Sequence, residues 1–346
     1  MTLADSGIHD VLLRGESAFA GGNGNGLLGK PRTTPAVVDG IPTAEQEIRK
    51  EIAIMKKCRH PHVVRLYEVI DDRKNDMVFM VMEYLGGGEV KYANSNGEPL
   101  LRVDQTRRIM RDAILGLEYL HHHEIIHRDI KPANLLWTEG HDKVKIADFG
   151  TAHFSYTQRL AAAKASGSST LLGTEEEPLL LNDADLAKRA GTPAFLAPEI
   201  VWEHTKVAEG ATPPPRPPVT KSIDIWALGV TLYCLSFGNT PFQSPQLLQF
   251  NDPRRNEFFH YNWVCNSERT VPETMGYDWV ETGGTSRTKS KEGAIIMHLL
   301  DHFLQKDLDC RITLEEIKVR FSFFFFWGGV QVLAFAFVVF ALLLRL

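Results

Sequence analysis

A polar motif in the middle of the chain combines the residue types that phosphoryl transfer needs. In HRDIKPANLL, Asp129 is followed two residues later by Lys131 and five residues later by Asn134. Asp148 follows 14 residues after Asn134, in the sequence DFG. A carboxylate such as Asp129 can accept or orient a hydroxyl proton, while the oxygens of Asn134 and Asp148 suit Mg²⁺. Since Lys131 can stabilise a moving phosphoryl group, all four residues are catalytic candidates.

Three motifs occur in the order that is typical of the eukaryotic protein kinases. HRD lies at 127–129, DFG at 148–150 and APE at 197–199, behind GTPAFL. Chance does not account for the three together at this spacing, so the chain resembles that family. The resemblance implies an α+β fold of two lobes, a mostly helical large lobe and a small β lobe, and ATP and Mg²⁺ as cofactors. Lys131 matches the pattern of serine/threonine rather than tyrosine kinases.

The resemblance implies a nucleotide-binding role for several further residues. Glu51 resembles the acidic residue of the regulatory helix, which in the family pairs with a lysine on the third strand. Met82, Glu83 and Leu85 belong to a stretch that resembles the adenine-binding hinge, and Glu89 resembles the residue that bonds the ribose.

Other residues resemble the supports of the catalytic loop. Thr192 is similar to the threonine that bridges this loop to the substrate site, and Asp224 to the acid that braces the loop from a central helix. Arg311 resembles the ion-pair partner of Glu199, and His127 is expected to pack beneath the phenylalanine of DFG.

Two longer stretches narrow the resemblance. EIAIMKKCRHPHVVRLYEVIDD and GTPAFLAPE are similar to the calcium/calmodulin-dependent protein kinase kinases, especially fungal relatives that activate AMP-activated-type kinases. The similarity covers about residues 46–318 and implies a protein substrate that is itself a kinase. No basic amphipathic helix follows the kinase region, so calmodulin binding is not supported.

Periodicity predicts the order of the elements. Residues 1–44 are Gly/Pro-rich and irregular, 45–85 form a remnant of the small lobe, and 86–319 form the large lobe with inserts at 155–190 and 205–220. Predicted helices cover 43–57, 101–122, 222–237, 293–305 and 313–318, and predicted strands cover 63–70, 77–84 and 143–149. The segment PPPRPP at 213–218 is expected to be an exposed rigid loop, with docking on an SH3-type partner as the alternative.

A nucleotide-loop pattern near the N-terminus is a false match. GNGLLGK at 24–30 satisfies G-x-G-x-x-G, but glycines precede it and Pro31 and Pro35 follow, so no strand flanks it. No apolar strand with a central lysine fits between Gly29 and Glu51. The chain is therefore expected to lack the first strands of the small lobe and the phosphate-clamping lysine, leaving apolar residues such as Ile52 and Val78 exposed.

Two interpretations of that small lobe remain open. The chain is either a truncated or mispredicted product of a kinase gene or a natural variant with crippled nucleotide binding. Its function is accordingly that of a serine/threonine kinase or that of a catalytically impaired pseudokinase that serves as a scaffold. Intact Asp129, Asn134 and Asp148 favour catalytic ancestry, and the missing lysine favours loss of activity in this chain.

The C-terminal tail is apolar enough to suggest a membrane anchor. Residues 321–344 read FSFFFFWGGVQVLAFAFVVFALLL, long enough for a transmembrane helix that leaves the kinase lobe in the cytoplasm. A read-through of non-coding sequence remains the alternative origin.

Composition excludes other classes of function. The chain has 38 basic and 43 acidic residues, and it contains no basic stretch that would bind nucleic acid. Four widely spaced cysteines predict reduced thiols in a cytosolic protein. The cluster of His121, His122, His123 and His127 could be taken for a zinc site, but it is expected to end a helix and open the catalytic loop.

Overall fold

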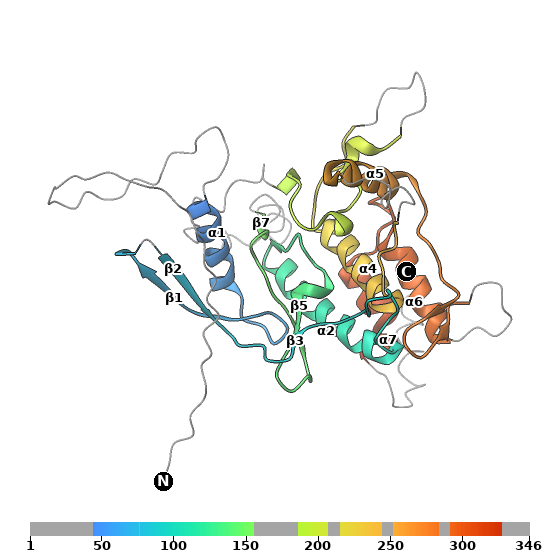
Figure 1. Ribbon diagram of the computed structural model, residues 1–346, viewed down its shortest axis with the longest axis horizontal. Coiled ribbons are helices and arrows are strands. Elements are labelled where there is room, and N and C mark those ends of the chain that lie inside the picture. Colours follow the sequence, from blue (N-terminus) through green and yellow to red (C-terminus); the bar gives the residue numbers. More distant parts are fainter. Residues whose placement is uncertain are drawn as a thin grey trace, which may run out of the picture.

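The computed structural model describes residues 44–75, 77–155, 186–206, 215–243, 252–283 and 291–326. A small group of elements at the N-terminal end, α1 with the strands β1 and β2, stands beside a larger and mostly helical body (Figure 1). The expected two-lobed α+β arrangement is therefore confirmed. The segment 1–44 was predicted to be irregular; its residues 1–43, with GNGLLGK, lie outside the described residues, as does most of the insert at 155–190.

The small lobe consists of one helix and one antiparallel strand pair in the described part of the chain. Helix α1 spans Ala44–Lys57, β1 spans Leu66–Asp72 and β2 spans Met77–Met82. All three were predicted. No residue of the two strands is buried, and Val78 is 41 % exposed, as expected. Ile52 is only 8 % exposed, so its predicted exposure was wrong. It is the first of four consecutive buried residues of α1.

The large lobe contains five helices in its described part, together with short strands and 3-10 turns. The helices are α2 (Val103–His122), α4 (Ser222–Phe237), α5 (Pro253–Asn266), α6 (Lys291–Phe303) and α7 (Leu314–Phe326). The strands are β3 (Gly88–Glu89), β4 (Ile125–Ile126), β5 (Leu135–Trp137), β6 (Val144–Ile146), β7 (His153–Phe154), β8 (Thr274–Met275) and β9 (Val280–Glu281). The 3-10 turns are η1 (Pro132–Asn134), η5 (Pro193–Phe195) and η6 (Trp202–His204). The strands pair antiparallel in the orders β3-β5-β6, β4-β7 and β8-β9.

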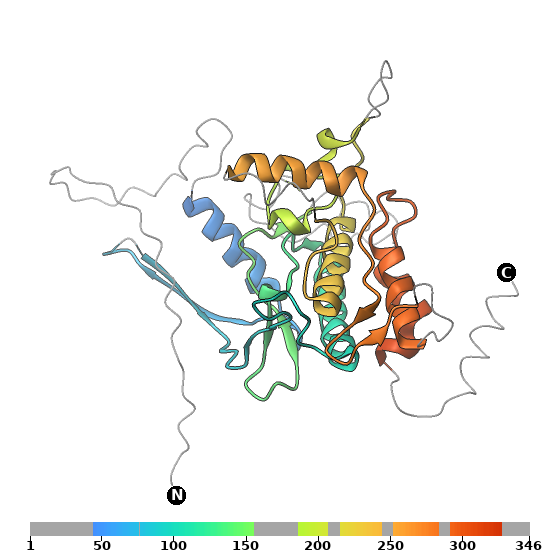
Figure 2. The same cartoon turned by 45° about the vertical axis from the view of Figure 1, so that its right-hand side comes forward.

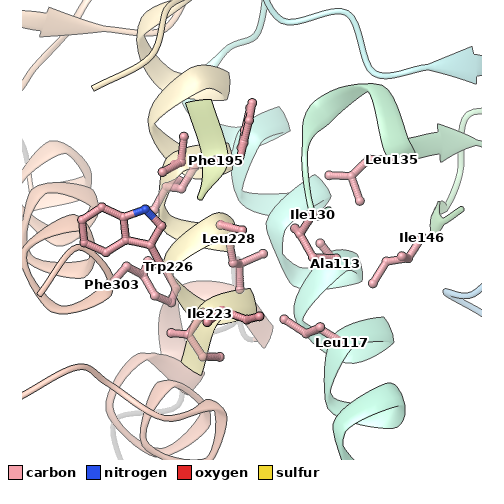
Figure 3. Packing of buried hydrophobic residues seen from close by; sticks show 14 of the residues in the cluster. Ala113, Leu117, Ile130, Leu135, Ile146, Phe195, Ile223, Trp226, Leu228 and Phe303 are labelled. Carbon is pink, nitrogen blue, oxygen red and sulfur yellow. The ribbon is translucent and has the colours of Figure 1, made fainter. Parts of the chain in front are cut away.

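The core of the large lobe lies around α4, which is buried on all sides. Figure 3 shows Trp226 and Leu228 of α4 packed between Phe303 of α6 on one side and Leu117 of α2 on the other. At Gly229 a Cβ atom would come within 2.5 Å of the Phe303 side chain, so this close approach of α4 and α6 requires glycine. Because α4 is enclosed by close packing, it can serve as a firm support for a neighbouring loop.

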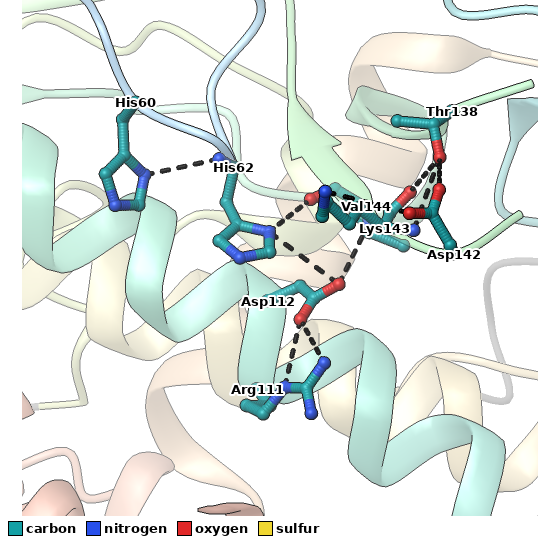
Figure 4. A network of polar contacts seen from close by, with 8 residues as sticks. All are labelled: His60, His62, Arg111, Asp112, Thr138, Asp142, Lys143 and Val144. Carbon is teal, nitrogen blue, oxygen red and sulfur yellow. Dashed lines mark hydrogen bonds and ion pairs between the residues drawn. The ribbon is translucent and has the colours of Figure 1, made fainter.

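A polar network fixes the strand that leads into the DFG motif (Figure 4). The buried Asp112 of α2 accepts the backbone N–H of Val144 at 3.0 Å, and His62 Nδ1 donates to the Val144 carbonyl at 2.9 Å. Asp112 also receives two hydrogen bonds from Arg111, at 3.0 and 2.9 Å. Both backbone groups of Val144 are therefore held, which sets the position of β6 against α2.

The predicted transmembrane helix over 321–344, and the membrane-anchored location derived from it, are wrong. Phe321–Phe326 continue α7, whose first half carries Lys318 and Arg320 and begins at a cap in which Glu316 N donates to Thr313 Oγ1. Thirteen residues span about 20 Å, short of a hydrocarbon core of about 30 Å. Among the described residues, none of the helices combines the length and the apolar character that a bilayer crossing requires. Residues 327–344 of the predicted span lie outside the described part.

A buried ion pair links the APE motif to the end of the large lobe. Arg311 donates to the two carboxylate oxygens of Glu199 at 2.6 and 3.0 Å, and both side chains are 1 % exposed. Arg311 also donates to the Ser222 carbonyl at 3.0 Å and lies over the Trp226 ring. The expected pairing of Arg311 with Glu199 is present.

Breaking this pair on one side leaves an uncompensated buried charge. We expect Arg311→Met to lower the free energy of unfolding by about 3–5 kcal/mol in urea denaturation. The double variant Arg311→Met/Glu199→Leu should lose less, because neither charge then remains buried. A double variant as unstable as the single one would contradict this account.

Candidate active site

The catalytic loop runs from β4 to η1, and the carboxylate of Asp224 in α4 holds its backbone. Asp224 Oδ2 accepts the backbone N–H of His127 at 2.9 Å, and Oδ1 accepts that of Arg128 at 2.8 Å. His121 Nε2 contacts Asp224 Oδ2 at 2.8 Å. Burial acts to raise the pKa of Asp224, but the hydrogen bond and charge of His121 bring it below its ordinary value. A charged acceptor therefore holds Arg128 in its left-handed conformation, with φ of 70°.

Both carboxylate oxygens of Asp129 are fixed by neighbours. Oδ1 accepts the backbone N–H of Thr192 at 2.8 Å, and Oδ2 accepts from Lys131 Nζ at 2.6 Å and Asn134 Nδ2 at 3.0 Å. Burial acts to raise the pKa of Asp129, but the hydrogen bonds from Lys131 and Thr192 bring it below the ordinary value. Asp129 is therefore an ionised carboxylate with a fixed orientation at neutral pH.

Thr192 joins the segment 187–200, which the family resemblance implies to be the substrate-side segment, to the catalytic loop. Its Oγ1 accepts a hydrogen bond from Lys131 Nζ at 2.7 Å, so one ammonium group contacts both Asp129 and Thr192. Gly191 before it has φ of 101°, and a Cβ atom there would lie 2.3 Å from the Arg128 carbonyl oxygen. Only glycine permits this approach, which brings the two segments into contact.

His127 connects the catalytic loop to the DFG motif. Its Nδ1 accepts the backbone N–H of Asp129 at 3.3 Å, so Nε2 carries the proton and donates to the Ala147 carbonyl at 3.1 Å. The ring packs edge-on against Phe149, with centroids 5.1 Å apart, as expected. Burial lowers the pKa of His127, which keeps the imidazole neutral. Asp148, which follows Ala147, has a left-handed backbone conformation with φ of 65°.

A cleft of about 600 Å³ opens between the strand pair β1–β2 and the catalytic loop. Met82, Glu83 and Leu85 line it, as do Asn134 and Asp148. The remaining lining residues are Glu51, Met55, Val64, Ile70, Phe79, Met80, Val81, Tyr84, Ala133, Leu136 and Ala147. Most of this surface is apolar, as suits a flat aromatic ring, and the polar groups include the candidate metal ligands.

Some site residues depart from their expected surroundings. Glu89 does not line the cleft; it lies in β3 and pairs with Lys91, so its role at a ribose stays a prediction. Glu83 forms an ion pair with Lys145 of β6 at 2.6 Å, which fixes the hinge against the large lobe. Lys145 was not predicted as a site residue. Its position three residues before Asp148 could have suggested that it lies near the site.

Glu51 faces the DFG motif from α1 without a cationic partner among the described residues. Burial, and then the negative charge of Asp148, raise the pKa of Glu51. The neighbouring Lys50 points elsewhere, with its Nζ 3.4 Å from His153 Nδ1. The lysine that the family places opposite this glutamate is not found in the part of the chain that the structure describes.

The histidine cluster does not form a metal centre. His121 is bound to Asp224 and His127 to the Ala147 carbonyl, while His123 Nδ1 donates to the Tyr119 carbonyl at 2.8 Å. In the described ranges, no group of three or more His, Cys, Asp or Glu side chains could hold a metal ion. Asn134 and Asp148, which both line the cleft, stay predicted ligands of Mg²⁺, an ion that usually takes several of its ligands from phosphate and water.

The motifs, the buried carboxylate of Asp129 and the cleft define a protein kinase domain. The protein kinase family model matches residues 39–321, so the chain belongs to this family. Several relatives are named serine/threonine-protein kinases, which confirms the class inferred from Lys131.

Particular relatives confirm the narrower resemblance. The chain is 39 % identical to serine/threonine-protein kinase ssp1 of Schizosaccharomyces pombe, over 80 % of this chain and 34 % of the relative. It is 44 % identical to SNF1-activating kinase 1 of Saccharomyces cerevisiae, over 80 % of this chain and 25 % of the relative. A calcium/calmodulin-dependent protein kinase kinase of Caenorhabditis elegans is 36 % identical over 61 % of this chain and 32 % of the relative. The chain thus spans about a quarter to a third of the length of these relatives.

The neutral, buried His127 makes stability depend on pH. Its pKa is lower in the folded chain than its ordinary value of 6.5, so its contribution is present above that value and is lost as the pH falls below it. We expect the unfolding free energy to fall between about pH 7.5 and pH 5.5, and His127→Gln to reduce that fall by about 1 kcal/mol. The exposed His141→Gln serves as the control, and an equal effect of both substitutions in urea titrations would refute the assignment.

Proposed function

We propose that this chain is a serine/threonine protein kinase that transfers the γ-phosphate of ATP to a hydroxyl of a protein substrate, which is a downstream kinase. The observation that carries the proposal is the fixing of both oxygens of Asp129, by Thr192 on one side and by Lys131 and Asn134 on the other. These contacts place one ionised carboxylate between the cleft and the substrate-side segment.

In this proposal Asp129 orients the substrate hydroxyl and takes its proton as the oxygen–phosphorus bond forms. The bond between the γ-phosphorus and the bridging oxygen breaks, and ADP leaves with the electron pair. Lys131 lies 2.6 Å from Asp129 and 2.7 Å from Thr192, so its charge is available to the transferred group. Fixed charge of this kind stabilises the transition state without reorganisation of water.

Asn134 and Asp148 are the residues that would hold Mg²⁺ with ATP. The Asn134 amide donates through Nδ2 to the carbonyl and carboxylate of Asp129, which leaves Oδ1 as the free acceptor. Two hard oxygen donors beside an apolar cleft fit a metal–nucleotide complex. When bound, Mg²⁺ neutralises charge on the phosphates. Met82 and Leu85, which line the cleft, would contact the adenine.

Support for a kinase as the substrate comes from the relatives. One of them is named as an activating kinase of SNF1, and its similarity extends over most of this chain. Since the chain covers a quarter of that relative's length, the substrate is proposed here by family relation alone.

A second candidate function is a kinase-like scaffold with impaired catalysis. The observation that favours it is Glu51, whose carboxyl faces Asp148 with no cation opposite it among the described residues. Without the lysine that clamps the α- and β-phosphates, the transition state would lose several kcal/mol of stabilisation, on the order of that from other charged active-site groups.

Removal of the Asp129 carboxylate tests the kinase proposal. We expect Asp129→Asn to lower kcat by about 100-fold or more, because proton acceptance by a positioned base contributes that much. The KM for ATP should change little. The exposed Asp309→Asn is the matched control, and transfer at the wild-type rate by Asp129→Asn, measured with radiolabelled ATP, would exclude this mechanism.

Nucleotide binding separates the two candidate functions. A non-hydrolysable ATP analogue at about 100 times its Kd should stabilise a binding-competent chain by about 2.7 kcal/mol, seen as a raised Tm. We expect the shift to need Mg²⁺ and to disappear in Asp148→Asn, while Glu51→Gln retains it. No shift in the unsubstituted chain would favour the scaffold. A shift lost in Glu51→Gln would indicate that a cation outside the described residues pairs with Glu51.

A further inference from the structure

The arginine of the proline-rich motif is part of the large lobe. Of PPPRPP, the described residues begin at Pro215, and Arg216 extends its guanidinium to three backbone carbonyls. Its Nη2 donates to Ala187 O at 3.1 Å and to Ile200 O at 3.3 Å, and its Nε donates to Glu199 O at 3.4 Å. One side chain therefore connects two stretches that are 12 residues or more apart in the sequence.

The stretches that Arg216 connects are the two ends of the substrate-side segment. Between Ala187 and Glu199 lie Gly191, packed against the catalytic loop, and Thr192, bonded to Asp129 and Lys131. A bridge across the ends of a loop reduces the number of conformations that the loop can adopt. Held in this way, the loop keeps Thr192 beside the catalytic carboxylate.

Each end of the segment 187–200 is also held by a contact other than that with Arg216. At the first end, Arg128 Nη2 donates to Lys188 O at 2.8 Å, next to the carbonyl that Arg216 binds. At the second end, the Glu199 side chain is paired with Arg311 in the core. Arg216 joins these two anchored ends directly, beside an ion pair of Arg189 with Glu203 that links the same two stretches.

The sequence around Arg216 suits a fixed bridge. Pro215, Pro217 and Pro218 have restricted backbones and no N–H groups that would need other partners, so little entropy is lost when the arginine is ordered. Lys221, at the N-terminus of α4, fixes the chain that follows the motif. It donates to the His121 carbonyl and forms an ion pair with Glu124. A guanidinium has several donors in a rigid plane and can therefore contact three carbonyls at once.

We infer that Arg216 is a positioning residue for protein-substrate binding. It acts through the backbone of the segment 187–200 and touches neither ATP nor the reacting atoms. The inference rests on the proposed kinase function for its effect on activity, while its structural content concerns the order of this segment alone. It also assigns the motif's arginine to an internal contact, which a partner of the SH3 type would have to break.

Two measurements test the inference, and the first needs no activity. Hydrogen exchange of the backbone amides in 188–201 should become about tenfold faster in Arg216→Met, as expected for the loss of hydrogen bonds that hold a local segment. Exchange in α4 should stay unchanged. Arg59→Met is the matched control, because Arg59 is also exposed and its guanidinium has no contact among the described residues. Unchanged exchange in 188–201 would overturn the inference whether or not the chain is active.

The second measurement is steady-state kinetics with a protein or peptide substrate. Arg216→Met should raise the KM for that substrate about fivefold, with the KM for ATP unchanged, since the contacts that it loses lie on the substrate side. Arg216→Lys keeps the charge but cannot reach three carbonyls, so it should behave like Arg216→Met. Wild-type values in the lysine variant would show that charge alone matters and would refute the bridge. An inactive wild-type chain with the expected exchange pattern would refute the proposed function, while the inference that Arg216 orders the segment 187–200 would still be supported.

Discussion

The catalytic loop depends on the hydrogen bonds that the Asp224 carboxylate accepts from two consecutive backbone N–H groups. A residue other than glycine in the left-handed region is costly, and Arg128 is held there by its N–H bond to this carboxylate. Asp224 can stay charged without exposure because His121 and the two amides satisfy it. The rigidity of the buried helix α4 is thereby passed to the loop that carries Asp129, Lys131 and Asn134.

The two faces of this loop have different physical characters. Toward the cleft, most of the lining is apolar, and the charged or amide side chains in it are those of Glu51, Glu83, Asn134 and Asp148. Toward the substrate side, contacts are made through backbone groups and charges, from Thr192, Lys131 and the carbonyls that Arg128 and Arg216 bind. An aromatic nucleotide base suits the first surface, and an extended peptide chain suits the second.

The sequence predicted the parts of the site that follow from local motifs and long periodic elements. The bounds of α4 agree with the prediction because every position from Ser222 to Phe237 suits a buried helix, and Gly238 ends it in a left-handed conformation. The very short strands β3, β4 and β7 were missed, since two residues hold no periodic pattern. The tail was misjudged because Phe321–Phe326 are apolar, yet they continue a helix that starts with charged residues.

Contacts between distant residues were beyond sequence reasoning unless the family supplied them. The Arg311–Glu199 pair was expected from the resemblance, whereas the bridge from Arg216 to Ala187 and the pairing of Glu83 with Lys145 were not. Both unexpected contacts depend on how loops meet after the helices have packed. The spacing of residues along the chain does not predict such contacts. Ile52 was misjudged for the same reason, since cover from elsewhere in the fold decides its exposure.

The sequence separations within the site bear on how the protein acquires activity during synthesis. Asp129 meets Thr192 across 63 residues, Arg128 meets Asp224 across 96, and Glu199 meets Arg311 across 112. A ribosome adds about 5–20 residues per second, so a nascent chain that has already exposed Asp129 remains without its loop brace for several seconds. The chain that emerges first therefore carries the catalytic residues in an unassembled form, and the substrate-side segment gains its buried anchor only when α7 is about to be made. The parts of the candidate site therefore come together only once the large lobe is complete, and they stay apart in the growing polypeptide.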